Sequence, residues 1–142
     1  MAPRFRDADE FQEALDAVFT LMDEDPDMGP KLRDADVPQR FEFDDLGLVL
    51  NVRAGDPDAG EGNLEWEWSD DVDWEPRVRM TMSSETANKY FQGKENVPIA
   101  IARRRIKTGG DVKASLALLP ITRPVFAQYA QLVEERWPHL KA

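Results

Sequence analysis

The sequence predicts an α+β fold, in which a sheet of mostly consecutive strands is preceded, interrupted and followed by helices. Three observations indicate it: a helical hydrophobic repeat before residue 26, alternating apolar residues between residues 37 and 68, and a strand followed by two capped helices from residue 77 onward. A chain of 142 residues can bury one core without a metal or a disulfide. We therefore expect a single domain over residues 1–142.

The first helix is expected over about residues 8–25. Asp7 is a suitable N-cap and Glu10 follows three residues later, which is the spacing of a capping box. The acidic run 23–25 and Pro26 end the helix. One face carries apolar residues at helical spacing: Phe11, Leu15, Val18, Phe19 and Met22.

Three strands follow, because the hydrophobic period changes from that of a helix to two. Phe41 and Phe43 are separated by a charged residue, and polar loops join the segments. Such short links favour an antiparallel meander with one face exposed to solvent. The other inward positions are Leu48, Leu50, Val52, Leu64, Trp66 and Trp68.

The next region combines a fourth strand with two short helices. Val78, Met80 and Met82 alternate along the strand, and a serine then caps a helix that Gly93 ends. Asn96 caps a second helix, and residues 104–108 are expected to form the fifth strand. A strand, a helical crossover and another strand predict a parallel, right-handed connection. Sheet and crossover thus span about residues 37–109.

The remainder is expected to form C-terminal helices over about residues 111–137. Asp111 starts the first, although the residues after it also alternate as in a strand. Pro120 and Pro124 are expected to separate it from a closing amphipathic helix. That helix carries an apolar stripe: Val125, Phe126, Tyr129, Leu132, Val133 and Trp137.

Charge divides the chain into two opposite halves. The net charge is −10, composed of −17 in residues 1–76 and +7 in residues 77–142. An acidic protein repels a phosphate backbone, so nucleic acid is not an expected partner. A dipolar surface of this kind instead orients a protein partner or neighbouring copies.

Composition also limits which metal sites, catalytic sites and cellular locations are expected. There is no cysteine and only one histidine, so neither a disulfide nor a thiolate or histidine-rich metal site is expected. No nucleophile, general base or phosphate loop stands in a catalytic pattern, and no cofactor is implied. The N-terminus lacks a secretory signal and no segment is apolar enough to cross a membrane, which favours a cytoplasmic protein.

The run VRMTMSSETANKYFQGKENVPIAIARRRIKTGGD resembles the sterol carrier protein type 2 (sterol-binding domain) family. Shared features are a strand, a serine-capped helix with aromatics, a Gly-Lys end, an Asn-x-Pro helix start and a basic strand closing on glycine and aspartate. The resemblance implies a five-stranded mixed sheet in the order 3-2-1-4-5, helices packed on one face, and an apolar cavity between the layers. It implies no catalytic residue.

An independent feature supports that strand order. If the strands lie so, outward residues alternate in sign across the first four strands of that order, which favours correct pairing. The outward residues are Glu65 and Glu67, Asn51 and Arg53, Glu42 and Asp44, Arg77 and Arg79, then Arg105 and Lys107.

The sequence therefore predicts non-enzymatic binding or transport of a hydrophobic ligand such as a fatty acid, an acyl chain or a sterol-like lipid. The alternative is a protein-interaction module with a dipolar surface, a packed interior and no ligand. Arg103 and Arg104 are candidates for binding a ligand head group. Candidate cavity residues are Phe43, Leu50, Trp66, Trp68, Met80, Met82, Phe91, Ile101, Leu116, Phe126 and Tyr129; ordinary core is the alternative role for them.

Overall fold

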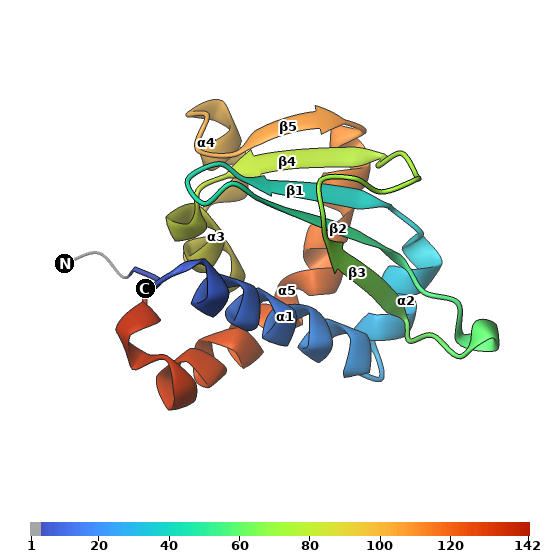
Figure 1. Ribbon diagram of the computed structural model, residues 1–142, viewed down its shortest axis with the longest axis horizontal. Coiled ribbons are helices and arrows are strands. Elements are labelled where there is room, and N and C mark those ends of the chain that lie inside the picture. The colour runs from blue at the N-terminus through green and yellow to red at the C-terminus, as the bar shows by residue number, and fades with distance from the viewer. Residues whose placement is uncertain (1–3) are drawn as a thin grey trace.

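A computed structural model describes residues 4–142 as a five-stranded mixed sheet with helices against one of its faces (Figure 1). The strand order is β3-β2-β1-β4-β5, which confirms the predicted α+β fold and its 3-2-1-4-5 sheet. The strands are β1 (Gln39–Phe43), β2 (Leu48–Ala54), β3 (Leu64–Trp68), β4 (Val78–Met82) and β5 (Lys107–Gly110).

Strands β1, β2 and β3 pair antiparallel, as the meander pattern predicts. The parallel pair is β1 with β4, whereas β4 and β5 are antiparallel. The predicted parallel crossover between the fourth and fifth strands is therefore wrong. The two short helices after β4 lead the chain out and back at the same end of the sheet, so that Lys107 enters beside Thr81.

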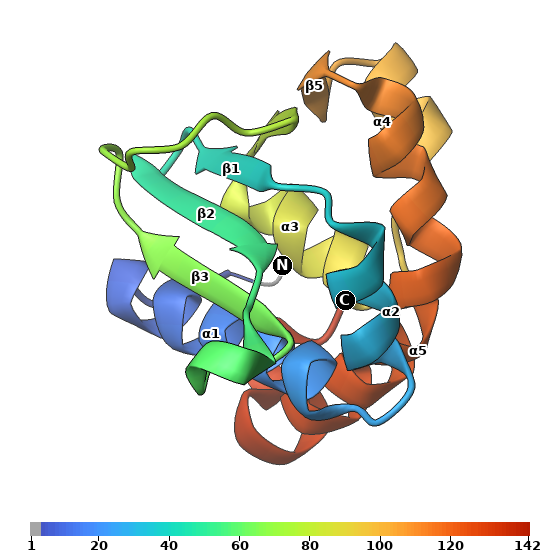
Figure 2. The same cartoon turned by 90° about the vertical axis from the view of Figure 1, so that its right-hand side faces the viewer.

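Five α-helices accompany the sheet within residues 4–142. Helices α1 (Ala8–Glu24), α2 (Met28–Ala35), α3 (Ser84–Phe91) and α5 (Val112–Arg136) lie below it, and α4 (Val97–Ala102) lies at its edge near β5 (Figures 1 and 2). Helix α1 begins as expected, because the Asp7 carboxylate accepts a hydrogen bond of 2.8 Å from the Glu10 amide. Its apolar stripe is buried against the sheet.

The strand register changes the expected charge pattern on the outer face. Arg53 pairs with Glu65 across β2 and β3 as predicted, at 3.3 Å. Arg79, however, lies opposite Arg40 of β1 rather than opposite an acidic residue, and its ion pair is with Glu75 in the preceding loop. Opposite charges therefore face each other between β2 and β3, as expected, whereas two arginines face each other between β1 and β4.

Strand β5 begins at Lys107, later than residues 104–108 predict. Residues 103–105 instead end α4: the Arg105 amide donates to the Ala100 carbonyl, and Arg104 adopts a left-handed φ of 61°. The arginine run is therefore a helix cap on the surface.

Helix α5 is continuous through Pro120 and Pro124, in place of the two C-terminal helices that the prolines predict. Both prolines lie on its exposed side. Leu116 and Pro120, whose carbonyls lose an amide partner there, are both exposed. Solvent access to these carbonyls lowers the cost of the interruption.

Candidate functional site

A narrow cavity of about 40 Å³ lies between the sheet and the helices. The sheet contributes residues from four strands, and the helical side contributes the first half of α5 together with α1, α2 and α3. From the sheet come Gln39, Phe41, Val52, Ala54, Leu64 and Met80. From the helices come Phe19, Met22, Leu32, Phe91, Ser115 and Leu118.

The pleat of the sheet explains which residues form the floor of the cavity. Phe41 is paired with Leu50 and with Met80, and Val52 with Gln39, so these side chains share the face that the helices cover. Within this set Gln39 is the polar exception. Its amide gives the otherwise apolar floor a group that can hydrogen-bond a guest.

Further polar side chains lie around the cavity. The Ser115 hydroxyl donates to the Met80 sulfur at 3.7 Å. Arg53 borders the cavity, but its guanidinium pairs with Glu65 on the outer face of the sheet. Burial raises the pKa of Tyr90 to about 12, so its hydroxyl stays protonated at neutral pH. The cavity is therefore apolar in its depth, with neutral hydrogen-bond donors at its edge.

The opposite end of the interior is filled by aromatic side chains. Phe11 of α1 contacts Phe43 at a centroid distance of 4.6 Å and Trp68 at 6.1 Å. Both indole N–H groups of β3 donate to one carboxylate oxygen of Asp16, over 3.1 Å from Trp66 and 2.7 Å from Trp68. The two tryptophans are thus fixed under α1, and neither lines the cavity.

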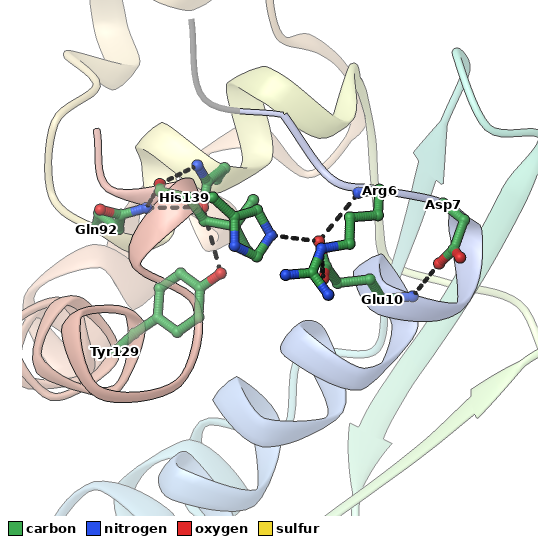
Figure 3. A network of polar contacts seen from close by, with 8 residues as sticks. Arg6, Asp7, Glu10, Gln92, Tyr129 and His139 are labelled. Atoms are coloured by element: carbon green, nitrogen blue, oxygen red, sulfur yellow. Dashed lines mark hydrogen bonds and ion pairs between the residues drawn. The ribbon is translucent and has the colours of Figure 1, made fainter.

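Tyr129 belongs to a polar network that closes the same end of the molecule (Figure 3). Its hydroxyl donates to the Asn88 side-chain oxygen, and the amides of Asn88 and Gln92 both donate to the Leu140 carbonyl over 2.8 Å. Burial and the charge of Glu10 raise the pKa of Tyr129. This network attaches the C-terminal 3₁₀ turn Pro138–Leu140 to α3 and α5.

Glu10 extends the network to the first helix (Figure 3). One of its carboxylate oxygens lies 2.8 Å from His139 Nε2 and accepts from the Arg6 amide at 3.0 Å. Burial raises the pKa of Glu10, but the hydrogen bonds and charges of His139 and Arg6 outweigh it and hold that pKa below its ordinary value.

Of the candidate ligand residues, the structure places Met80 and Phe91 on the cavity wall. Phe43, Leu50, Met82, Trp66, Trp68 and Tyr129 lie elsewhere in the interior, and Ile101 and Phe126 pack at its margin. Leu116, Arg103 and Arg104 are exposed. A ligand-contacting role for these residues stays a prediction.

Sequence reasoning missed several wall residues that share a pattern with those it chose. Val52 and Leu64 follow the same alternation as Leu50 and Trp66, and Phe19 lies on the apolar stripe of α1. The alternation identifies the inward face of each strand. It does not show which inward positions face a void, because that depends on the helix opposite.

Within residues 4–142 no group of three or more histidine, aspartate and glutamate side chains is placed to hold a metal ion. Over that same part of the chain, no helix combines the length and apolar character needed to cross a bilayer.

The architecture is thus an α+β domain with helices on one face of a mixed sheet and a cavity between the layers. Solved structures with this fold include the apo form of sterol carrier protein 2 from Yarrowia lipolytica, with a TM-score of 0.58 and 12% identity over 89% of this chain and 99% of that chain. A second is the ubiquinone synthesis protein UbiJ-SCP2, with a TM-score of 0.61 and 9% identity over 81% of this chain and 89% of that one. The chain has the sterol carrier protein 2 fold.

A third similar structure is a double mutant of the sec-alkyl sulfatase PisA1. Its TM-score is 0.61 and its identity 19% over 75% of this chain, but the match covers only 16% of that enzyme. No protein-family model and no curated protein matches the sequence. Identities of 9% to 19% establish a shared fold and no shared activity.

Proposed function

We propose that the protein binds a hydrophobic small molecule, such as a fatty acid, an acyl chain or a sterol-like lipid, in the cavity between sheet and helices, and carries it without chemical change. The observation that supports this is the cavity itself: an apolar space between the sheet and the first half of α5, with Gln39 and Ser115 at its edge. The names of two similar structures support a hydrophobic ligand, since they refer to a sterol carrier and to ubiquinone synthesis.

The first half of α5 is the part of the wall best suited to move. The empty cavity admits only a few water molecules, whereas pockets that enclose such ligands measure about 300 to 1,000 Å³. In the first half of α5 only Leu118 is buried, whereas Val125, Tyr129 and Val133 in the second half are fully buried. Two prolines weaken the helix between these parts. Outward movement of residues 112–122 therefore enlarges the cavity at small cost.

Apolar burial supplies the affinity in this proposal. Removing about 300 Å² of ligand surface from water at about 25 cal/mol per Å² contributes roughly 7 kcal/mol before the costs of association and opening. The polar groups at the edge then favour a ligand with one polar end. No catalytic role is assigned, because the cavity brings together no nucleophile and base.

Titration of the delipidated protein with a fluorescent fatty acid tests the proposal, with adjacent residues of α5 as matched variants. Ser115 lines the cavity and Leu116 is exposed, so Ser115→Phe is expected to fill the cavity and weaken binding at least tenfold. Leu116→Phe is expected to bind as the wild type does. Saturable binding that both variants retain unchanged places the ligand elsewhere and contradicts the proposal.

The narrowness of the cavity favours one second candidate, a protein-interaction module whose interior holds no ligand. In that case the same titration shows no saturable binding. Native mass spectrometry of freshly purified protein then detects no co-purified lipid, and affinity must come from the dipolar surface instead.

A further inference from the structure

The surface of α4, β5 and the first half of α5 differs in charge from the rest of the molecule. Residues 94–123 hold seven basic and two acidic side chains, for a net charge of +5, so the remaining residues carry −15. Both acidic side chains are already paired: Glu95 with Arg105 at 2.7 Å and Asp111 with Arg77 at 2.8 Å. The segment therefore presents an uncompensated positive field.

Nearly all cations without an ion pair lie in this segment. Among residues 4–142, eleven of the eighteen lysines and arginines form an ion pair with a carboxylate. Of the seven others only Arg4 lies outside residues 94–123. The six within it are Lys94, Arg103, Arg104, Lys107, Lys113 and Arg123.

The same segment carries the two large apolar side chains that are exposed in the described part of the chain. Ile99 on α4 is 45% exposed and Leu116 on α5 is 39% exposed. The outward face of α5 between residues 112 and 127 is likewise free of negative charge. Its other exposed residues there are small, proline or basic, and none is acidic. They are Lys113, Ala117, Pro120, Arg123, Pro124 and Ala127.

The two helices form one surface, which we call the basic apolar face and define as the exposed residues of 94–127. An open groove joins them, lined by Val97 and Pro98 of the α4 region and by Leu119 and Arg123 of α5. Helix α4 and the first half of α5 lie on the side of the molecule away from β3 and α1 (Figure 2). Aliphatic side chains are thus surrounded by cations that lack a partner within the molecule.

We propose that the basic apolar face docks on the surface of an anionic phospholipid bilayer. Cations flanking exposed aliphatic groups fit a bilayer interface, where phosphate oxygens neutralise the cations and the aliphatic groups enter the acyl boundary. The opposite charge of the remaining surface is repelled by the same bilayer, so the dipole turns this face toward it. The acidic half of a second copy is the competing occupant, but it offers no apolar medium for Ile99 and Leu116.

If the proposed function holds, docking of this face also affects the entry of a ligand into the cavity. The inward side of the same stretch of α5 lines the cavity through Ser115 and Leu118. Contact of its outward side with lipid therefore acts on the wall that must move for a ligand to enter. Docking itself requires no ligand.

Flotation of the delipidated protein with vesicles tests the docking. Wild-type protein is expected to bind vesicles of phosphatidylcholine and phosphatidylglycerol in equal parts, and not vesicles of phosphatidylcholine alone. Arg103→Glu with Arg123→Glu is expected to lower the affinity at least about 30-fold, since each cation near an anionic surface contributes roughly fivefold. Lys31→Glu with Lys141→Glu makes the same charge change away from the face and is expected to stay within about twofold.

A second variant tests the apolar part and does not depend on charge reversal being tolerated. Ile99→Ser with Leu116→Ser keeps every cation, and is expected to lose the binding that survives at high ionic strength. Absence of wild-type binding to the anionic vesicles overturns the proposal, as does equal loss in the two charge variants. Concentration-dependent self-association without vesicle binding assigns the face to a second copy instead. Failure here leaves the fatty-acid titration, and the carrier function, untouched.

Discussion

The two ends of the layer between sheet and helices are built from similar side chains but differ in how completely they are filled. At the end covered by the start of α1, Phe11 contacts Phe43 and Trp68 edge-on, and the rings of Phe43 and Trp68 pack at a tilt. At the other end, Phe41 and Met80 line a cavity together with Ser115 of the first half of α5. The difference shows that the helix opposite, more than the residue type on the strand, decides whether an inward position forms solid core or cavity wall.

Helices α1 and α5, which cover these two ends, differ in how many of their residues are buried. Helix α1 buries seven residues over its seventeen and is fixed to β3 through Asp16. Helix α5 buries four residues over its twenty-five, three of them in its second half. Stability is therefore concentrated at the filled end, and the capacity to open is concentrated at the hollow end.

The largest expected effect compares two phenylalanines on one strand. Phe43→Ala is expected to lower the free energy of unfolding by about 3 to 5 kcal/mol, because it removes a ring that is in contact on all sides. Phe41→Ala should cost about 1 kcal/mol less, since Phe41 already lacks partner atoms on its cavity side. Urea melts of both variants measure the difference, and a greater loss for Phe41→Ala would reverse the assignment of the two ends.

A smaller effect is expected where α1 is joined to the tryptophans. Asp16→Ala removes the shared acceptor of both indole N–H groups and should cost about 1 to 3 kcal/mol, with a shift in tryptophan emission. Glu13→Ala, on the exposed side of the same helix, is the control and should change stability by less than about 1 kcal/mol with no spectral change. Unchanged emission in Asp16→Ala would show that this contact does not hold the indoles.

The smallest expected effect depends on pH and concerns the polar network at the filled end. The folded pKa of Glu10 lies below its ordinary value of about 4.5, so its ionised form stabilises the fold above that pH and the benefit is lost as pH falls through the folded pKa. Glu10→Gln should therefore be about 1 to 2 kcal/mol less stable than wild type near neutral pH. Thermal melts over a pH series should show the difference in stability between the variant and wild type decreasing below about pH 4.5. A difference that is constant with pH would contradict a stabilising role for the ionised Glu10 carboxylate.

Much of the fold can be read from local patterns because they report local physics. The spacing of Phe11, Leu15 and Met22 defines the buried stripe of α1, and the Asp7 cap fixes its start. Alternation in β1 to β4 defines which face of each strand meets the helices. The strand order came from the family resemblance, and the structure confirms it.

Within the candidate site, the sequence identified the apolar face but not the cavity. Met80 and Phe91 lie on the wall, whereas Trp66 and Trp68 fill space beneath α1. The tryptophans were reasonable candidates for a ligand site, since flat rings adapt to apolar guests. Their position under Asp16 depends on how α1 crosses β3, which no local pattern encodes.

Element types, their caps and their inward faces can be predicted from the sequence, since each follows from residues close together in the chain. Three other features depend on contacts between distant segments: the register that places Arg79 beside Arg40, the continuity of α5 through Pro120 and Pro124, and the end of the interior that remains hollow. One cause explains all three. Register, helix continuation and void volume are set by the fit between surfaces that distant segments bring together, and a periodic pattern specifies which side of a segment is apolar without specifying what it meets.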